Sequence, residues 1–179
     1  MNVADKQYKK LIIEILKNGN DRCDRTGIGT RSVFGYSMRF DISEAFPMIS
    51  TKKVFFKGVV EELLWMISGN TCSEDLSKKG VRIWDANGTK EFLENRGLKY
   101  ESGDLGPVYG HQWRHFNAEY KTCKDDYDGK GVDQLQEVVR QIREEPSSRR
   151  IILSAWNPSQ NAEMALPPCH TLCQFYVDG

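Results

Sequence analysis

The chain has 179 residues, and its 25 lysines and arginines balance 25 aspartates and glutamates, so the formal net charge is zero. This length suits one domain with its own hydrophobic core, and a zero net charge excludes a global field that would attract nucleic acid or an anionic membrane. Any anion site must therefore depend on locally clustered cations. No apolar run reaches bilayer length and the N-terminus lacks a secretory pattern, which indicates a soluble intracellular protein.

The cysteines are odd in number and scattered along the chain, at positions 23, 72, 123, 169 and 173. No C-x-x-C pair is present, so the spacing favours neither a disulfide framework nor a zinc site. We therefore expect reduced thiols and no bound metal.

Helical periodicity is the strongest local signal. Apolar residues at helical spacing predict helices over 8–18, 56–67 and 132–142, and a shorter helix is predicted over 89–97. Glu62 lies on the flank of the second helix, where partial burial would raise the pKa of its carboxyl group and suit it to general acid or base work. The alternative is a rim glutamate paired with a lysine. The predicted core stripe of this helix comprises Phe56, Val59, Val60, Leu63, Leu64 and Ile67.

Strands and loops follow from other patterns. Alternating side chains predict a half-buried strand over 34–40, and apolar runs predict a strand over 151–156 and a buried strand over 169–177. The glycine-punctuated segment 103–115 is predicted to be a loop rich in functional groups, and 117–131 is predicted to be a polar surface segment.

Two groups of arginines could bind phosphate. Arg25 lies in the glycine-containing segment 24–31, whose N–H groups could surround an anion, although a plain flexible turn fits the same residues. Arg149 and Arg150 precede the strand predicted over 151–156, where they suit bidentate phosphate contacts or simply face solvent.

Cys169 is the candidate nucleophile. It follows Pro167 and Pro168, which fix a rigid turn before a strand and would hold the thiol in place. An inert buried cysteine is the alternative. His170 is adjacent in sequence, but successive side chains of an extended segment point to opposite faces, which argues against a Cys-His hydrolase. The supply of arginines instead favours a thiolate that adds to carbon, because nearby positive charge would lower the pKa of the thiol.

Six segments, in order along the chain, resemble the thymidylate synthase family of eukaryotic type. Individually each motif is weak, but six in the family's order are specific, and they cover essentially the whole sequence. They are residues 24–27, 62–65, 83–85, 103–110, 148–152, and 168–170 with 174–177.

The resemblance implies reductive methylation of dUMP to dTMP by 5,10-methylenetetrahydrofolate, which leaves dihydrofolate. In this reading Cys169 adds to C6 of the pyrimidine, Glu62 organises waters and proton transfers at the pyrimidine carbonyl, and Tyr109 assists removal of the C5 proton. No metal is implied.

The resemblance also implies binding roles. Arg25 would bind the nucleotide phosphate from its own subunit, Arg149 and Arg150 would reach the site of the partner subunit, and His170 would lie near the nucleotide. The folate site would be lined by Lys52, Ile83, Trp84, Asn87 and Leu166.

The implied fold is a single α/β domain of the α+β type over 1–179, with a large, mostly buried sheet flanked by helices and a sheet-to-sheet homodimer in the cytoplasm or nucleus. Asp178 and Gly179 predict a hairpin turn with a returning strand, and the family's chain continues, so we expect the C-terminal part of the domain to lie beyond this sequence. That part would hold the asparagine that selects uracil and an aspartate for folate.

Two alternatives remain open on the residues present. A nucleotide hydroxymethylase of the same fold would transfer the one-carbon unit to the pyrimidine without reducing it, and a truncated, non-catalytic relative would bind a nucleotide without turnover.

Overall fold

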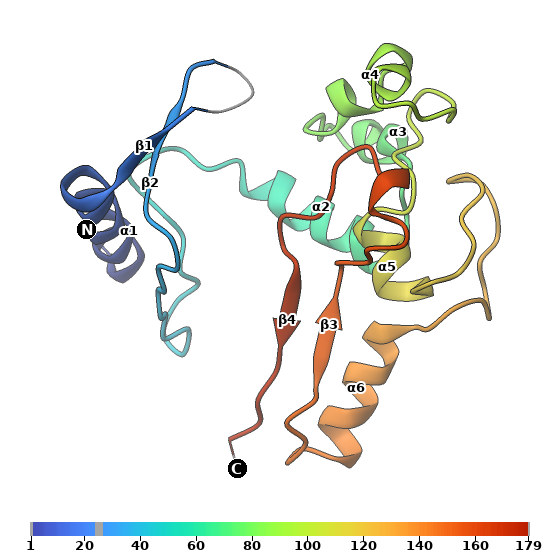
Figure 1. Ribbon diagram of the computed structural model, residues 1–179. Coiled ribbons are helices and arrows are strands. Elements are labelled where there is room, and N and C mark those ends of the chain that lie inside the picture. The colour runs from blue at the N-terminus through green and yellow to red at the C-terminus, as the bar shows by residue number, and fades with distance from the viewer. Residues whose placement is uncertain (1, 24–26, 179) are drawn as a thin grey trace. The chain divides into compact units, whose positions relative to one another are not determined.

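The computed structural model describes residues 2–23 and 27–178, which form two compact units, 1–55 and 56–179. Their elements are labelled in Figure 1. The first unit contains helix α1 (Val3–Asn18) and the antiparallel strands β1 (Asn20–Arg22) and β2 (Thr30–Ser32), with Asn20 opposite Ser32. The predicted N-terminal helix is thus confirmed, and it begins five residues earlier than expected.

A capping box explains the start of α1. The Asn2 side chain accepts a hydrogen bond from the Asp5 backbone N–H at 2.8 Å, and the Asp5 carboxylate accepts one from the Asn2 backbone at 3.3 Å. Asp5 also accepts hydrogen bonds from the Ser50 hydroxyl and backbone N–H, and these bonds lower the pKa of its carboxyl group. This buried carboxylate therefore joins the start of α1 to the far end of the first unit.

The prediction of a strand over 34–40 is wrong. These residues have no regular structure, and Phe34 and Tyr36 are exposed. Alternation of residue types makes a strand only where a neighbouring strand takes its hydrogen bonds, and the pairing of β2 ends at Ser32. The backbone N–H of Arg39 instead donates to the Gln7 side chain at 3.1 Å.

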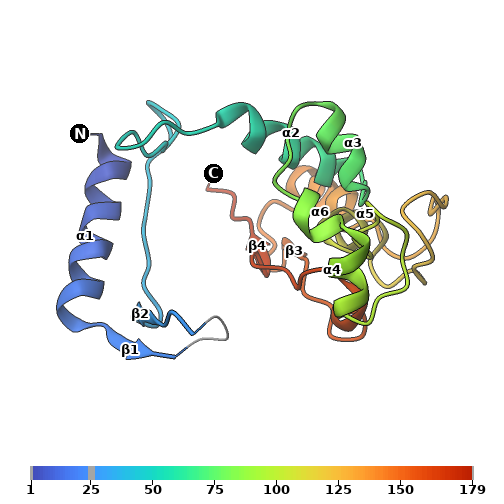
Figure 2. The same cartoon turned by 90° about the horizontal axis from the view of Figure 1, so that it is seen from above.

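The second unit consists mainly of short helices around one core, followed by a strand pair. Its strands β3 (Ile152–Ser154) and β4 (Leu172–Gln174) lie side by side (Figures 1 and 2) and pair antiparallel, and their register places Leu153 opposite Cys173. The predicted helices over 56–67, 89–97 and 132–142 and both predicted C-terminal strands are confirmed, with bounds shifted by a few residues. The helices are α2 (Phe56–Ile67), α3 (Ser73–Lys78), η1 (Asp85–Gly88), α4 (Lys90–Asn95), α5 (Tyr109–His115), α6 (Gln134–Glu144) and η2 (Asn161–Glu163).

The predicted core stripe of α2 is wrong except at Ile67, which is partly buried and packs against the core. Val59, Leu63 and Leu64 are about half exposed, and the helix instead buries Trp65 and Met66. Apolar residues occur on most sides of α2, so periodicity could not tell which side packs against α3 and α5. The main core includes Leu76, Leu93, Leu105, Val108, Ile151, Leu153, Met164 and Ala165.

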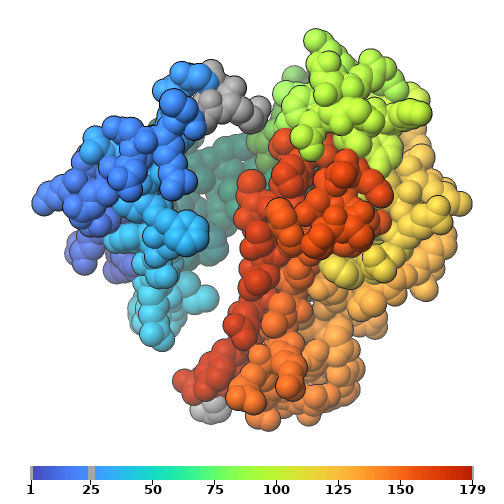
Figure 3. All heavy atoms as spheres, in the orientation of Figure 1, coloured from blue at the N-terminus to red at the C-terminus, as the bar shows by residue number. Residues whose placement is uncertain are grey.

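The C-terminal strand is exposed, contrary to the prediction of a buried one. All three residues of β4 are solvent-exposed, and Figure 3 shows this last segment at the surface beside the residues that lead into β3. Within the described residues β4 pairs with β3 alone, so no second neighbour covers its outer edge.

The segment 103–115 is only partly the loop that its glycines predicted, because its second half is α5. Gly110 permits this helix: a Cβ atom there would lie 2.8 Å from the carbonyl carbon of Gly69 and closer still to the Asn70 carbonyl oxygen. Five consecutive residues of α5, 109–113, are buried. The helix is therefore central to the second unit although it is short.

Buried polar groups hold α5 from several sides. The side-chain amide of Gln112, fully buried, donates to Pro107 O at 2.9 Å and to Gln160 Oε1 at 3.0 Å, and Asn157 donates to Gln112 Oε1 at 3.1 Å. Gln134 of α6 donates to the carbonyls of Gln112 and Ser154 and accepts from the Ser154 N–H. Helix α5, helix α6 and strand β3 thus share one hydrogen-bond network.

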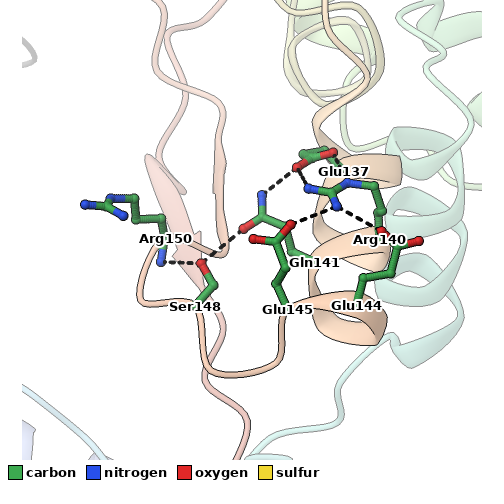
Figure 4. Close-up of polar contacts among 7 residues, drawn as sticks. All are labelled: Glu137, Arg140, Gln141, Glu144, Glu145, Ser148 and Arg150. Atoms are coloured by element: carbon green, nitrogen blue, oxygen red, sulfur yellow. Dashed lines mark hydrogen bonds and ion pairs between the residues drawn. The ribbon is translucent and has the colours of Figure 1, made fainter.

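Arg114 joins three further points of the unit. Its guanidinium donates to both carboxylate oxygens of Asp133, which caps the start of α6, and to Ile67 O at the end of α2. Arg140 also contacts carboxylates, and within the described part of the chain these belong to Glu137, Glu144 and Glu145, all within α6 or the residue that follows it (Figure 4).

Replacing Arg114 with Met should therefore destabilise the fold far more than the same change at Arg140. Loss of the Arg114 hydrogen bonds to charged and backbone acceptors is expected to lower the free energy of unfolding by about 2 kcal/mol, whereas exposed contacts within one helix add little. Urea denaturation of both variants measures the difference. Equal effects of the two substitutions would contradict this account of Arg114.

Candidate functional site

Cys169 lies at a turn held by a tyrosine hydroxyl. Pro168 is buried, whereas Cys169 and His170 are exposed. The hydroxyl oxygen of Tyr109, the first residue of α5, accepts the backbone N–H of Cys169 at 2.6 Å and that of His170 at 3.3 Å. The ring of His170 stacks on the Tyr109 ring with centroids 4.9 Å apart. A rigid helix therefore fixes the backbone that presents the thiol.

Burial raises the pKa of Tyr109, and negative charge on the Cys169 sulfur and on the Glu62 carboxylate raises it further. The hydrogen bonds from the backbone N–H groups of His170 and Cys169 to this oxygen lower the pKa and partly offset the rise. The net result is a phenol that stays protonated at neutral pH. Because its oxygen already accepts from the turn, its own proton is available to an acceptor in the site.

Glu62 has an indole as its partner. Its Oε1 accepts a hydrogen bond from Trp84 Nε1 at 2.7 Å, and the carboxylate is partly buried. The alternative of a lysine-paired rim glutamate applies to the neighbouring Glu61, which forms an ion pair with Lys79 at 3.0 Å. The Trp84 ring lies 6.2 Å from that of Trp65 in the core, so the indole is itself held in place.

The residues expected at the folate site divide into three groups. Ile83 is exposed, and Asn87, within η1, is partly exposed, so both can contact a ligand. Trp84 is buried and holds Glu62, and Leu166 packs against the main core. Lys52 is exposed and belongs to the first unit, so the structure does not place it with the others.

Arg149 and Arg150 are exposed just before β3 and lie far from Cys169 of the same chain. Strand register puts Ile151 beside Phe175, whereas Ala155 lies beside Thr171, next to the reactive turn. The four residue steps from Ile151 to Ala155 span roughly 13 Å of strand. The Arg150 side chain points away from the carboxylates of α6 (Figure 4), and no ion pair among the described residues involves either arginine. Arg25 lies outside the described residues.

The described residues also bear on three other features: a Cys-His pair, a metal-binding group and a membrane-spanning helix. The hydrogen bonds found there at the reactive turn run from backbone to Tyr109, and none joins the Cys169 thiol to the His170 ring. Residues 2–23 and 27–178 contain no group of three or more His, Cys, Asp or Glu side chains placed to bind a metal ion. Over the same residues, no helix has the length and apolar character needed to cross a membrane.

Comparison with known proteins decides the family. A family model of thymidylate synthase matches residues 6–179. The chain belongs to the thymidylate synthase family. It is 57% identical over 172 residues to the thymidylate synthase of Homo sapiens, and 56% identical over 177 residues to that of Equine herpesvirus 2. It is also 55% identical over 174 residues to the bifunctional dihydrofolate reductase-thymidylate synthase of Paramecium tetraurelia.

These alignments cover nearly all of this chain but only part of each relative. They include 96%, 98% and 97% of this chain, respectively, but 55%, 61% and 38% of the three relatives. The chain therefore spans about half the length of the curated thymidylate synthases that it matches.

Sequence reasoning missed the residues that support the candidate site. It assigned Trp84 to folate and overlooked its hydrogen bond to Glu62, because 22 residues separate the two. It also missed the buried amides of Gln112, Asn157 and Gln160 beneath α5. No local pattern marks such residues, since a polar side chain that will be buried looks the same in sequence as an exposed one.

Replacing Tyr109 with Phe should loosen the reactive turn while keeping the ring. Loss of a hydrogen bond of about 1 kcal/mol is expected to speed amide hydrogen exchange at Cys169 and His170 about fivefold. NMR exchange measurements on the variant and the unmodified protein test this. Tyr100→Phe, which alters a tyrosine packed edge-on against Tyr120, is the matched control and should leave both amides unchanged. Unaltered exchange in Tyr109→Phe would show that the hydroxyl does not hold the turn.

Proposed function

We propose that the protein carries out the reductive methylation of dUMP to dTMP, with 5,10-methylenetetrahydrofolate as the source of the one-carbon unit and the hydride. One observation carries the proposal: an exposed cysteine lies on a turn fixed by a buried, protonated tyrosine, with a partly buried glutamate nearby, in a chain of the thymidylate synthase family. Dihydrofolate is the second product.

The chemistry follows from the positions of these groups. The Cys169 thiolate adds to C6 of the pyrimidine, and the electron pair of the C5–C6 double bond moves towards the carbonyl, which makes C5 nucleophilic. Glu62, held by Trp84, relays protons through water to and from that carbonyl. The Tyr109 hydroxyl lies at the same turn as Cys169 and assists removal of the C5 proton. His170, stacked on Tyr109, lies beside the nucleotide.

The residues present fit a folate. Its flat ring system needs an apolar surface with a few polar groups, and Ile83 and Leu166 offer apolar surface while Asn87 offers an amide. Trp84 holds Glu62 in place and offers the edge of its indole ring to the folate. Lys52 supplies a positive charge for the anionic tail of the folate. When bound, the folate supplies the methylene group and then the hydride that converts it to a methyl group.

The distant arginines support a shared site in a homodimer. A phosphate next to the Cys169 turn lies beyond the reach of Arg149 and Arg150 of the same chain, because the strand pair separates them. In the proposed dimer these two side chains bind the phosphate in the partner's site, and Arg25 binds it from its own subunit. The β3–β4 pair, in which all three β4 residues are exposed, would belong to the large buried sheet of one domain over 1–179, paired sheet to sheet across the dimer. We place this dimer in the cytoplasm or nucleus.

Mixing two inactive variants tests both the activity and the shared site. The unmodified protein should form dihydrofolate from dUMP and methylenetetrahydrofolate, followed by absorbance, while Arg149→Ala and Cys169→Ala should each be inactive. After subunit exchange the mixture should regain about a quarter of the activity, because half of the dimers are mixed and each mixed dimer has one intact site.

The outcomes separate the alternatives. Turnover of nucleotide without dihydrofolate would identify a hydroxymethylase, and saturable nucleotide binding without turnover would identify a non-catalytic relative. Dihydrofolate formation by the unmodified protein with no recovery in the mixture would retain the reaction and reject the shared site.

A further inference from the structure

A second pair of thiols lies away from the proposed catalytic site. Cys72, at the start of α3, is 7% exposed, and Cys123, in the segment between α5 and α6, is partly exposed. Their side chains are joined by a hydrogen bond, although 50 residues separate them in sequence. Both line a cavity of about 80 Å³ next to Asp104.

Asp104 fixes both cysteines. Cys72 forms an antiparallel β-bridge with Asp104, and the buried Asp104 carboxylate accepts the backbone N–H of Cys123 at 2.9 Å. The same carboxylate accepts the Tyr120 hydroxyl at 2.7 Å, and that hydroxyl is joined to Thr71 at 2.8 Å. The two thiols therefore meet on a rigid support, and their contact does not depend on a mobile loop.

The surroundings make the two thiols unequal. The hydrogen bond from Cys123 lowers the pKa of Cys72, because it stabilises the Cys72 thiolate. The same bond, together with burial and the negative charge of Asp104, raises the pKa of Cys123. A thiol whose pKa is lowered thus lies beside a thiol whose pKa is raised, which is the arrangement of an oxidisable cysteine and its resolving partner.

We propose that Cys72 and Cys123 form a redox modification site, in which hydrogen peroxide converts the pair reversibly into a disulfide. The site is separate from the proposed catalytic cysteine and does not rest on the proposed function. The cavity beside the pair is large enough for an oxidant of this size, since a water molecule occupies about 30 Å³ in the liquid.

The reaction proceeds in two balanced steps. The Cys72 thiolate attacks one peroxide oxygen, the O–O bond breaks, and hydroxide leaves with a proton to form water, so that Cys72 becomes a sulfenic acid. Cys123 then attacks the Cys72 sulfur, the S–O bond breaks, and the thiol proton leaves with the hydroxide as a second water. In total two thiols lose two electrons and two protons to one peroxide, and a dithiol reductant reverses the change.

Peptide mapping can read this pair without interference from the other cysteines. Trypsin releases Cys72 in the peptide 58–78 and Cys123 in the peptide 122–124, while Cys23, Cys169 and Cys173 fall in other peptides. After mild peroxide treatment, alkylation and digestion without reductant, we expect these two peptides joined, with two hydrogen atoms fewer than their sum. Dithiothreitol should separate them again.

Two variants sharpen the test. Cys123→Ser should abolish the cross-link and leave the Cys72 sulfenic acid unresolved, so that dimedone labels peptide 58–78. Cys173→Ser, which removes an exposed cysteine that contacts neither member of the pair, is the matched control and should keep the cross-link. The proposal is overturned if Cys72 and Cys123 of the unmodified protein remain alkylatable while other cysteines oxidise, or if either one pairs with another cysteine instead.

Discussion

The hydroxyl of Tyr109 is the contact on which the candidate site depends. It satisfies the backbone N–H groups of Cys169 and His170 at the turn after the two prolines, where no strand yet supplies an acceptor. The prolines restrict the backbone angles before the turn, and the Tyr109 oxygen holds the two N–H groups that follow. The thiol can remain exposed to a substrate while its backbone is held, which keeps the geometry for attack without burying the nucleophile.

Tyr109 can hold the turn because α5 is itself held by hydrogen bonds to the rest of the second unit. The helix is short, and buried polar groups hold it together with the apolar packing of Tyr109 and Trp113: Gln112 is tied to residues 157–160, and Gln134 ties α6 and β3 to it. Arg114 links α5 to the end of α2 through its hydrogen bond to the Ile67 carbonyl. Such a network is sensitive to single changes, because removal of one partner leaves a buried donor or acceptor unsatisfied. The same rigidity extends to Asp104, which holds the thiol pair outside the site.

The sequence predicted elements where periodicity and packing agree. Helices α2 and α6 are long enough for their apolar spacing to be visible, and the β3–β4 pair follows from two apolar runs. Helix α5 was missed because its seven residues contain a glycine and no apolar stripe, and the strand over 34–40 failed because alternation says nothing about a hydrogen-bonding neighbour. The buried side of α2 was assigned wrongly, since its apolar residues extend around the helix.

For the site, Cys169, Glu62 and Tyr109 were reached through ordered motifs, and the structure brings them together. What holds them was not predictable, because the contacts join residues as far apart as Tyr109 and Cys169 by backbone and ring geometry that no local pattern encodes. The hydrogen bond from the Trp84 indole to Glu62 was unpredictable for the same reason.

The most direct test of the central claim is covalent capture at Cys169. 5-Fluoro-dUMP cannot lose its C5 substituent as a proton, so a thiolate that has added to C6 and a methylene group that has joined C5 should remain attached. With methylenetetrahydrofolate present, mass spectrometry is expected to find both groups on the tryptic peptide that begins at Ile151, and Cys169→Ser should abolish the adduct. An adduct on another cysteine, or none on Cys169 in protein that binds the nucleotide, would contradict the account.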